Sequence, residues 1–406
     1  MANIRHIYIL SITAAIIAAF TSFFSNEVKM AFFLFAIVMD TLVNKNAFSS
    51  KPLKLLLVFF VISFFYVFVL GRGHFSEIRN ILLAYPMMLM CFWIAPGLTK
   101  LNSKEVSFIW GAFFLCLVET LIATTFIGQV DPLAVRYSFS NAEAGNEALA
   151  HAYSRMGMLS YQSSHLLSVL CSFLVVLAFK VKPLWKKLIV LFIALLPVYV
   201  MYLMTITTAL LLGLLCMVAV AVFLFSKGNI RAFVVWFTVL TVLLLVTGGL
   251  TNILFSSSRG ENYEIAEKLN DLAFSIESGS SQGQVAGREI EYNKTWDAII
   301  RNPIFGGANG PEDTGQHALL FDYWAYYGIF SLVLFVAWWK EVKRMKSILG
   351  RKKWILYLIC VLPIFLLCFF KGPAFLPYYI LVTIVILRLG FLSLGSKPST
   401  ICVKHR

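Results

Sequence analysis

Apolar runs of about twenty residues follow one another along most of this 406-residue chain, with few charges inside them. Runs of that length span a bilayer core when they are helical, and they lack the apolar and polar alternation of barrel strands. Within hydrocarbon every backbone N–H and C=O must pair inside the protein, so the runs must be helices. The composition agrees, because 60% of the residues are hydrophobic and only 13% are charged. We therefore expect an all-α, polytopic integral membrane protein.

About twelve transmembrane helices are expected, each an apolar run bounded by charged residues, glycine or proline. The predicted spans are residues 7–24, 28–43, 53–71, 79–96, 106–127, 158–180, 187–203, 206–226, 232–250, 318–339, 354–370 and 373–392. The seventh and eighth are separated only by polar residues around Thr205, so one long or re-entrant element is the alternative there. The chain then divides into residues 1–250 with the first nine helices, 251–317 as a large external loop, and 318–406 with the last three helices and a cytoplasmic tail.

The distribution of charge predicts the orientation. Placing the N-terminus in the cytoplasm puts most lysines and arginines inside and leaves only Asp40, Glu105 and Glu341 of the 20 acidic residues there. This bias agrees with an even number of spans and two cytoplasmic termini. It also accounts for the formal net charge of +14, which is therefore no argument for a nucleic-acid partner. The first run has no small-residue cleavage site, so we expect it to be retained as a span.

Signatures of metal, disulfide and nucleotide chemistry are missing from the sequence. The seven cysteines fall in apolar runs or near the C-terminus without paired ligand spacing. HExxH, GxSxG, Walker and kinase motifs are absent, and no carboxylate cluster resembles a metal cage. Gly306, Gly307 and Gly310 do not follow a strand, so they predict a flexible loop rather than a phosphate-binding one. We expect metal-independent chemistry that needs no cofactor.

Two predicted external segments, residues 128–157 and 251–317, are too long to be turns. Long loops that are not linkers tend to carry function. In the second, residues 261–277 have the pattern of an amphipathic helix, and a Gly, Ser and Gln-rich hinge follows at 279–287. Another helix is expected over residues 288–301, where isoleucines and a tryptophan recur at helix-compatible spacing before Asn302 and Pro303 end it.

Arg155, Arg288 and His317 are external basic residues at or near predicted helix ends. An arginine fork binds phosphate or pyrophosphate, and histidine can accept a hydroxyl proton near neutral pH. Together they would suit transfer from a lipid pyrophosphate. Structural roles are the alternatives: a headgroup contact for Arg155, a pair with Glu289 or Glu291 for Arg288, and a hydrogen bond to a carbonyl for His317.

Other ionisable residues near the outer ends of spans are weaker candidates. Arg72 and Arg79 follow the third span and could add to a phosphate-binding rim, with headgroup contact as the alternative. His165 is expected inside the sixth span as a buried, hydrogen-bonded side chain. Glu119 and Asp322 lie within or at the ends of spans, where charge is costly, but near enough to the outer interface to be solvated.

A series of short motifs lies between residues 287 and 330. They are Gly287-Arg288-Glu289, Trp296, Asn302-Pro303-Ile304-Phe305-Gly306-Gly307, His317-Ala318-Leu319-Leu320 and Tyr327-Gly328-Ile329-Phe330. This series resembles the O-antigen polymerase and O-antigen ligase superfamily of bacterial inner-membrane glycosyltransferases. The rest of the chain is similar to that superfamily in its hydropathy profile, with a large periplasmic loop late in a chain of about twelve spans.

The resemblance implies that Arg288 holds the donor pyrophosphate and that His317 orients or deprotonates the acceptor hydroxyl. It implies a glycan on undecaprenyl pyrophosphate as donor and acceptor, reacting at the periplasmic face of the bacterial inner membrane. Membrane lipids and a chain-length regulator are the other implied partners. The further residues expected to contact pyrophosphate or glycan are Arg155, Arg72, Arg79, Trp296 and Tyr161.

Two segments separate a polymerase from a ligase. Ligases of this superfamily usually carry an arginine at the outer start of a mid-chain span, where this chain has Thr208. The run from Arg155 to Gln162 is similar to the polymerase pattern of an arginine, a glycine and an aromatic entering a span. We therefore expect a lipopolysaccharide O-antigen polymerase, with a ligase that transfers the glycan to lipid A-core as the alternative. A polysaccharide or lipid-linked sugar transporter is the alternative from another class, although the chain shows no internal repeat.

Overall fold

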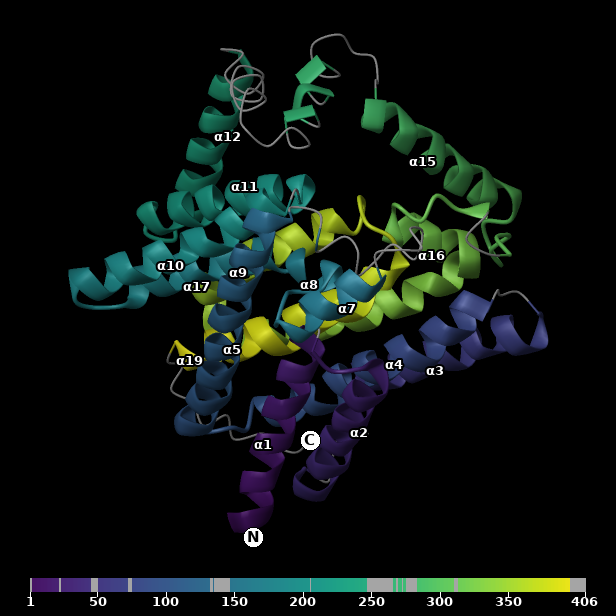
Figure 1. Cartoon of the computed structure of the whole chain (residues 1–406), viewed down its shortest axis with the longest axis horizontal. Helices are drawn as coiled ribbons and strands as arrows, with labels where there is room; N and C mark the ends of the chain where they lie inside the picture. The colour runs from purple at the N-terminus through teal and green to yellow at the C-terminus, as the bar shows by residue number, and fades with distance from the viewer. Residues whose placement is uncertain are drawn as a thin grey trace.

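A computed structural model describes residues 2–21, 23–44, 50–71, 75–131, 134, 147–204, 206–246, 266–267, 269–271, 273–274, 283–309 and 313–394. These residues form helices and connecting turns, and their only β pairing is a single bridge between Thr21 and Leu159. The expected all-α class is therefore confirmed. Figure 1 shows the helices crossing at many angles, with α15 lying along the outside of the bundle above α16.

The helices are named in chain order. Those of the first half are α1 (Ala2–Phe20), α2 (Asn26–Val43), α3 (Lys51–Phe64), η2 (Phe65–Val69), α4 (Phe75–Leu98), α5 (Ser103–Val130), α7 (Glu147–Arg155), α8 (Tyr161–Ser164), α9 (Leu167–Lys180) and α10 (Leu184–Leu203). Those of the second half are α11 (Thr207–Phe225), α12 (Ile230–Val246), α15 (Gly283–Arg301), α16 (Leu319–Tyr327), η4 (Gly328–Phe330), α17 (Ser331–Leu367), η5 (Pro373–Phe375), α18 (Leu376–Ile380), η6 (Leu381–Ile386) and α19 (Leu387–Ser393).

Eight helical stretches among the described residues are long and apolar enough to cross a membrane. They are Asn3–Phe20, Lys51–Val69, Ser103–Val130, Tyr161–Lys180, Leu184–Leu203, Thr207–Phe225, Leu319–Leu367 and Pro373–Ser393. These are the helices of a membrane protein in length and composition. The tenth and eleventh predicted spans share one of the stretches, and α2 falls outside the set with its charged residues Glu27, Lys29 and Asp40. The total of about twelve spans, the orientation and the three-region division stay predictions.

The seventh and eighth predicted spans are separate helices. α10 ends at Leu203 and α11 begins at Thr207, so the single long element proposed as an alternative for this region is not formed. The tenth predicted span, in contrast, is broken. α16 ends where Gly328 takes a φ of 57°, a conformation that glycine adopts without the strain a Cβ would cause. α17 then bends at Gly350, whose φ is 70°, and joins the tenth and eleventh predicted spans.

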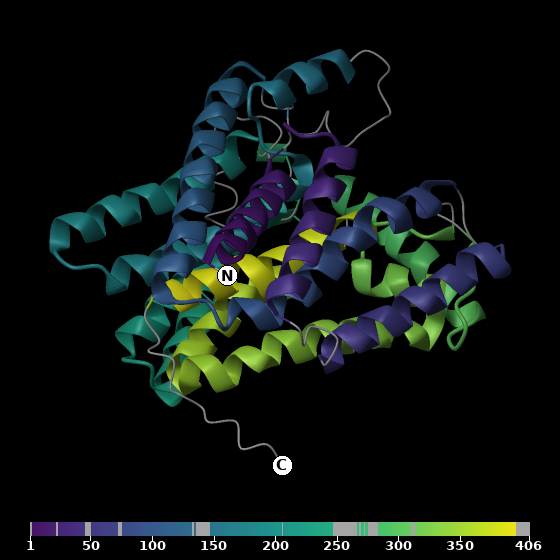
Figure 2. The same ribbon diagram turned by 90° about the horizontal axis from the view of Figure 1, so that it is seen from below.

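The centre of the bundle is formed by α9 and by the C-terminal stretch from η5 to α19. α9 packs against α10, α11 and α17, while α19 packs against α5. Both stretches are buried on nearly every face, as expected for helices that are surrounded by other helices. Figure 2 shows the C-terminal stretch in yellow in the middle of the molecule, with α17 and α3 side by side.

The long segment after α12 is described only in part. The amphipathic helix predicted over 261–277 lies mostly outside the described residues, as do residues 279–282 of the predicted hinge. The helix predicted over 288–301 is confirmed. α15 begins earlier, at Gly283, so the hinge prediction is wrong for residues 283–287.

The turn after α15 packs tightly against the end of α16. Ile329 N–H donates a hydrogen bond to the carbonyl oxygen of Ile304 over 3.1 Å. A Cβ on Gly306, whose φ is 73°, would lie 2.2 Å from the carbonyl oxygen of Tyr326. Glycine is therefore required here because two backbone segments approach each other closely.

The predicted flexible loop is thus wrong for its first two glycines. Gly306 is buried against α16, and Gly307 N–H donates a hydrogen bond to the carbonyl oxygen of Ala325 over 2.9 Å. Gly310 lies outside the described residues. Gly306 and Gly307 therefore allow close packing of two backbone segments. Glycines in a sequence do not show by themselves whether they allow close packing or make a loop flexible.

We expect Gly306→Ala and Gly328→Ala to destabilise the protein. The left-handed backbone alone costs a residue with a Cβ about 1–2 kcal/mol, and a Cβ on Gly328 would also lie 2.1 Å from the carbonyl oxygen of Ile304. Gly287→Ala is the matched control, because Gly287 is helical and has nothing within 4 Å of its Cβ position. Thermal unfolding of the detergent-solubilised variants is the measurement. Equal unfolding temperatures for Gly306→Ala and Gly287→Ala would contradict the packed turn.

Arg388 and Glu341 form an ion pair in the interior of the bundle. Both side chains are 0% exposed, and Arg388 Nη2 lies 2.8 Å from Glu341 Oε1. Arg388 Nη1 also donates to the carbonyl oxygen of Ala95 over 2.7 Å. The other Glu341 oxygen lies 3.8 Å from Arg344, whose side chain is exposed. The pair joins α17, α19 and α4 at one place.

Candidate functional site

One face of α15 turns polar side chains toward the bundle. Thr295 is 1% exposed, and the Tyr292 hydroxyl donates a hydrogen bond to the carbonyl oxygen of Phe369 over 2.6 Å. Arg288 lies one turn before Tyr292, and residues four apart share a helix face. α15 therefore places Arg288 on the side that is attached to the turn after α17.

Three apolar residues of α15 lie on its outer face. Ile290, Trp296 and Ile300 are 60%, 52% and 62% exposed, whereas Ala298 and Ile299 are buried at 3% and 4%. Exposed apolar side chains on this face suit a helix at a bilayer interface. Trp296, a predicted substrate contact, touches the ring edge of Phe321, with 6.2 Å between the ring centres.

His317 stands in a loop that is held on both sides by one turn. Before it, Gln316 comes so near Gly372 that a Cβ there would lie 2.1 Å from the Gln316 carbonyl oxygen. After it, Leu319 N–H donates to the carbonyl oxygen of Lys371 over 2.8 Å. These backbone contacts bring the His317 loop next to Lys371, which comes 54 positions later in the sequence. Lys371 is near enough for its positive charge to act on the imidazole of His317.

Lys371 continues the site toward the start of α8. Its Nζ lies 3.4 Å from the Tyr161 hydroxyl and 5.6 Å from the centre of the Tyr161 ring. Tyr161 also packs edge-on against His165, with 4.7 Å between ring centres. The predicted contact Tyr161 thus joins the site, with the lysine as its neighbour.

His165 is buried, as predicted, but only one of its nitrogens is hydrogen-bonded. Nδ1 lies 2.9 Å from the carbonyl oxygen of Tyr161. A carbonyl can only accept, so Nδ1 carries the proton and Nε2 presents a lone pair. Within the part of the chain that the structure describes, Nε2 has no hydrogen-bond partner. The expectation of a fully satisfied histidine is therefore wrong.

We call Arg288, His317 and Lys371 the basic cluster. Partial burial lowers the pKa of His317 below its ordinary value of 6.5, and the positive charges of Arg288 and Lys371 lower it further. Glu291 acts in the opposite direction with a smaller effect. Near neutral pH the imidazole is therefore uncharged and can accept a proton beside two cations.

Two structural alternatives, a pair with Glu291 for Arg288 and a hydrogen bond to a carbonyl for His317, receive little support. Glu291 pairs with Lys294 at 3.1 Å, so it is engaged along the helix and not by Arg288. The ring of His317 forms no hydrogen bond with a carbonyl among the described residues, and its side chain is exposed. Both side chains therefore stand where a ligand at the protein surface can contact them.

Of the three other arginines predicted to contact pyrophosphate or glycan, only Arg155 has a side chain that the structure describes. Arg155 is exposed at the last turn of α7, a position where a cation is favoured by the helix dipole, and it forms no hydrogen bond or ion pair with the cluster in the described structure. Arg72 lies outside the described residues. Arg79 lies in α4, but its side chain is outside the described part.

Asp322 differs from its prediction because it is 0% exposed rather than solvated. Its Oδ1 accepts a hydrogen bond from the Thr295 hydroxyl over 3.0 Å, and its Oδ2 accepts one from Ala318 N–H over 3.1 Å. These bonds compensate the cost of burying the carboxyl group. Asp322 therefore lies beneath the loop that carries His317.

Lys371 was missed by the sequence analysis, which used it only as the boundary between two predicted spans. In the predicted orientation the short turn at 371–372 is external, and a positive residue is unusual at the outer end of a span. That departure from the charge rule was the available signal. The contact between this turn and the His317 loop could not be predicted from the sequence, because the two segments are far apart in the chain and meet only in the folded protein.

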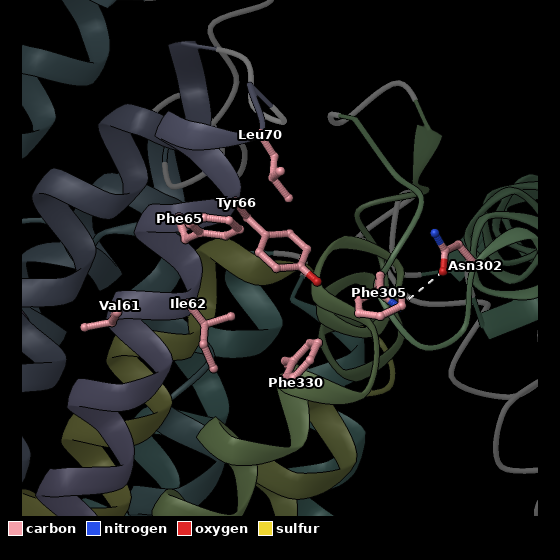
Figure 3. Close-up of a pocket in the computed structure, with 8 residues that line it drawn as sticks. All are labelled: Val61, Ile62, Phe65, Tyr66, Leu70, Asn302, Phe305 and Phe330. Carbon is pink, nitrogen blue, oxygen red and sulfur yellow. Dashed lines mark hydrogen bonds between the residues drawn. The ribbon is translucent and has the colours of Figure 1, made fainter.

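An apolar pocket lies at the opposite end of α16 from His317. Figure 3 shows Tyr66 and Phe330 facing into it, with Asn302 at its rim beside Phe305. Its volume is about 480 Å³, and its lining residues are Val61, Ile62, Phe65, Tyr66, Leu70, Asn302, Phe305 and Phe330. The nine residues of α16 span about 13 Å, so the pocket and the basic cluster are separate features.

The arrangement suits an anion and a hydroxyl rather than a metal. Arg288 and Lys371 offer positive charge, and neutral His317 offers a proton acceptor between them. Groups of His, Cys, Asp and Glu placed to hold a metal ion are absent from the described residues. Comparisons with models of protein families, with curated proteins and with solved structures found no match.

Proposed function

We propose that this chain is an O-antigen polymerase, a glycosyltransferase that joins oligosaccharide repeat units carried on undecaprenyl pyrophosphate at the outer face of the bacterial inner membrane. The observation that carries the proposal is the basic cluster. The cluster combines two cations with an uncharged imidazole. Arg288 comes from α15, His317 from the loop before α16, and Lys371 from the turn after α17. The sequence motifs around Arg288 and His317 supply the choice of reaction.

In the proposed reaction an acceptor sugar hydroxyl attacks the anomeric carbon of the donor glycan. A new glycosidic C–O bond forms, and the bond between that carbon and the pyrophosphate oxygen breaks. The lipid pyrophosphate leaves with the electron pair, while the hydroxyl proton passes to His317. Arg288 and Lys371 stabilise the negative charge that develops on the leaving group. Tyr161 keeps the Lys371 ammonium group in place.

The function is tested by the lipopolysaccharide banding pattern of a strain that lacks this gene. We expect a core bearing a single repeat in the deleted strain and a full ladder after complementation with the wild-type chain. Loss of every repeat from the core, with lipid-linked polymer retained, would identify a ligase instead. Accumulation of unpolymerised units on the cytoplasmic side would identify a transporter.

The proposed role of His317 predicts a pH dependence. The imidazole must be uncharged to accept a proton, so kcat/KM should be constant near neutral pH and fall as the pH drops through the His317 pKa, which lies below 6.5. Lys371→Met removes a nearby positive charge, so it should move this acidic limb upward toward 6.5 as well as lower the rate. Initial rates in proteoliposomes at a series of pH values are the measurement.

Arg301→Gln is the control for that pH profile. It removes a positive charge from the exposed last turn of α15, away from Arg288. Its acidic limb should coincide with that of the wild type. A limb that is unchanged in Lys371→Met would show that this lysine does not act on the catalytic base.

A further inference from the structure

Asp322 connects two segments that carry the candidate catalytic groups. On one side, the Thr295 hydroxyl of α15 donates to its Oδ1. On the other, Ala318 N–H donates to its Oδ2 over 3.1 Å. His317 directly precedes Ala318, so the carboxyl group holds the loop immediately after the histidine.

Thr295 strengthens this connection because it bonds in two directions. Its Oγ1 accepts a hydrogen bond from Gly315 N–H over 2.9 Å while the hydroxyl proton is directed at Asp322. Thr295 is 1% exposed and lies two turns after Arg288 in α15. One pair of buried side chains therefore joins the helix of Arg288 to the loop of His317.

The hydrogen bonds made by Asp322 and Thr295 are buried, so the loss of one acceptor is costly. A buried N–H that loses its acceptor costs about 1–3 kcal/mol. Replacing Asp322 by Leu, which is similar in size, removes both acceptor oxygens, so the buried Ala318 N–H loses its partner. That N–H regains a partner when the loop moves toward solvent, which carries His317 with it.

We propose that Asp322, together with Thr295, is a positioning residue that fixes His317 beside Arg288 and Lys371. The catalytic meaning of this arrangement rests on the proposed function, whereas the arrangement itself does not. The pair touches no substrate atom. The pair holds the His317 loop in one place relative to α15.

The experiment measures His317 directly in the full-length protein in detergent. Diethyl pyrocarbonate acylates uncharged imidazole, and peptide mass spectrometry separates His317 from the other five histidines. The rate of modification against pH gives both the accessibility and the titration midpoint of His317. The charged groups that act on this midpoint are Arg288 and Glu291 from α15 and Lys371 from the facing turn.

In Asp322→Leu and in Thr295→Val the imidazole of His317 should no longer be held beside the two cations. The midpoint should move upward toward 6.5, because the imidazole leaves the two cations. Thr295→Ser keeps the hydroxyl and should behave as the wild type does. Buried His165 provides an internal reference that should stay unreactive in every folded variant.

An unchanged midpoint of His317 in both Asp322→Leu and Thr295→Val would overturn the inference. If Asp322→Leu does not fold, the comparison of Thr295→Val with Thr295→Ser carries the test. A released His317 in a protein whose wild type transfers no glycan would contradict the proposed function and leave the positioning link intact. If the wild-type protein transfers glycan, both variants should lower kcat more than they raise KM.

Discussion

Arg288→Ala should lower the rate of polymer formation by about a hundred- to a thousandfold, the loss seen when one preorganised donor to a developing oxyanion is removed. The expected cause is that negative charge on the leaving pyrophosphate is then met by Lys371 alone. Arg288→Lys should recover part of the rate, because it restores the charge but not the fork that binds two oxygens. Initial rates with lipid-linked repeat units in proteoliposomes are the measurement.

Arg301→Ala is the matched control for Arg288→Ala, since both arginines belong to α15 and Arg301 is exposed in its last turn. It should change the rate by less than a factor of about two, as expected for a solvated surface charge. Membrane levels of all variants must be equal. A rate for Arg288→Ala within the range of this control would remove Arg288 from the site.

Arg388→Met should destabilise the bundle strongly. It leaves the Glu341 carboxyl group at 0% exposure without its 2.8 Å partner, and breaking a buried pair in this way costs about 3–5 kcal/mol. It also leaves the carbonyl oxygen of Ala95 without the Arg388 hydrogen bond. The unfolding temperature of the detergent-solubilised protein should therefore fall clearly below that of the wild type.

Two further variants separate this pair from a general loss of charge. Arg344→Met removes an exposed arginine 3.8 Å from the same carboxyl group and should cost about 0–1 kcal/mol. The double variant Glu341→Gln with Arg388→Met should regain much of the stability, because neither charge is then buried alone. If Arg388→Met and Arg344→Met unfold at the same temperature, the buried pair does not stabilise the bundle.

The helices were predictable from the sequence because apolar runs indicate membrane-spanning segments, and the charged residues or glycines at their ends indicate the helix boundaries. Each predicted span overlaps a helix, and α15 was expected from its periodicity. The break at Gly328 was not predicted, since the residues on both sides are apolar and continue the run. What ends α16 is the approach of Ile304 to Gly328, a contact between distant segments.

The candidate site was predicted only in part, for a related reason. Arg288, His317 and Tyr161 could be selected because each stands at a predicted helix boundary in a recognisable motif. Lys371 and Thr295 could not, because their roles depend on which turns meet after folding.

The most direct test of the central claim uses purified wild-type protein in proteoliposomes with one substrate, the repeat unit on undecaprenyl pyrophosphate. Our account predicts a ladder of longer lipid-linked glycans at integer multiples of the repeat, formed without added nucleotide, and absent from matched preparations of Arg288→Ala and His317→Ala. A wild-type preparation that moves the lipid-linked unit across the membrane without lengthening it, or a ladder that persists in both variants, would contradict it.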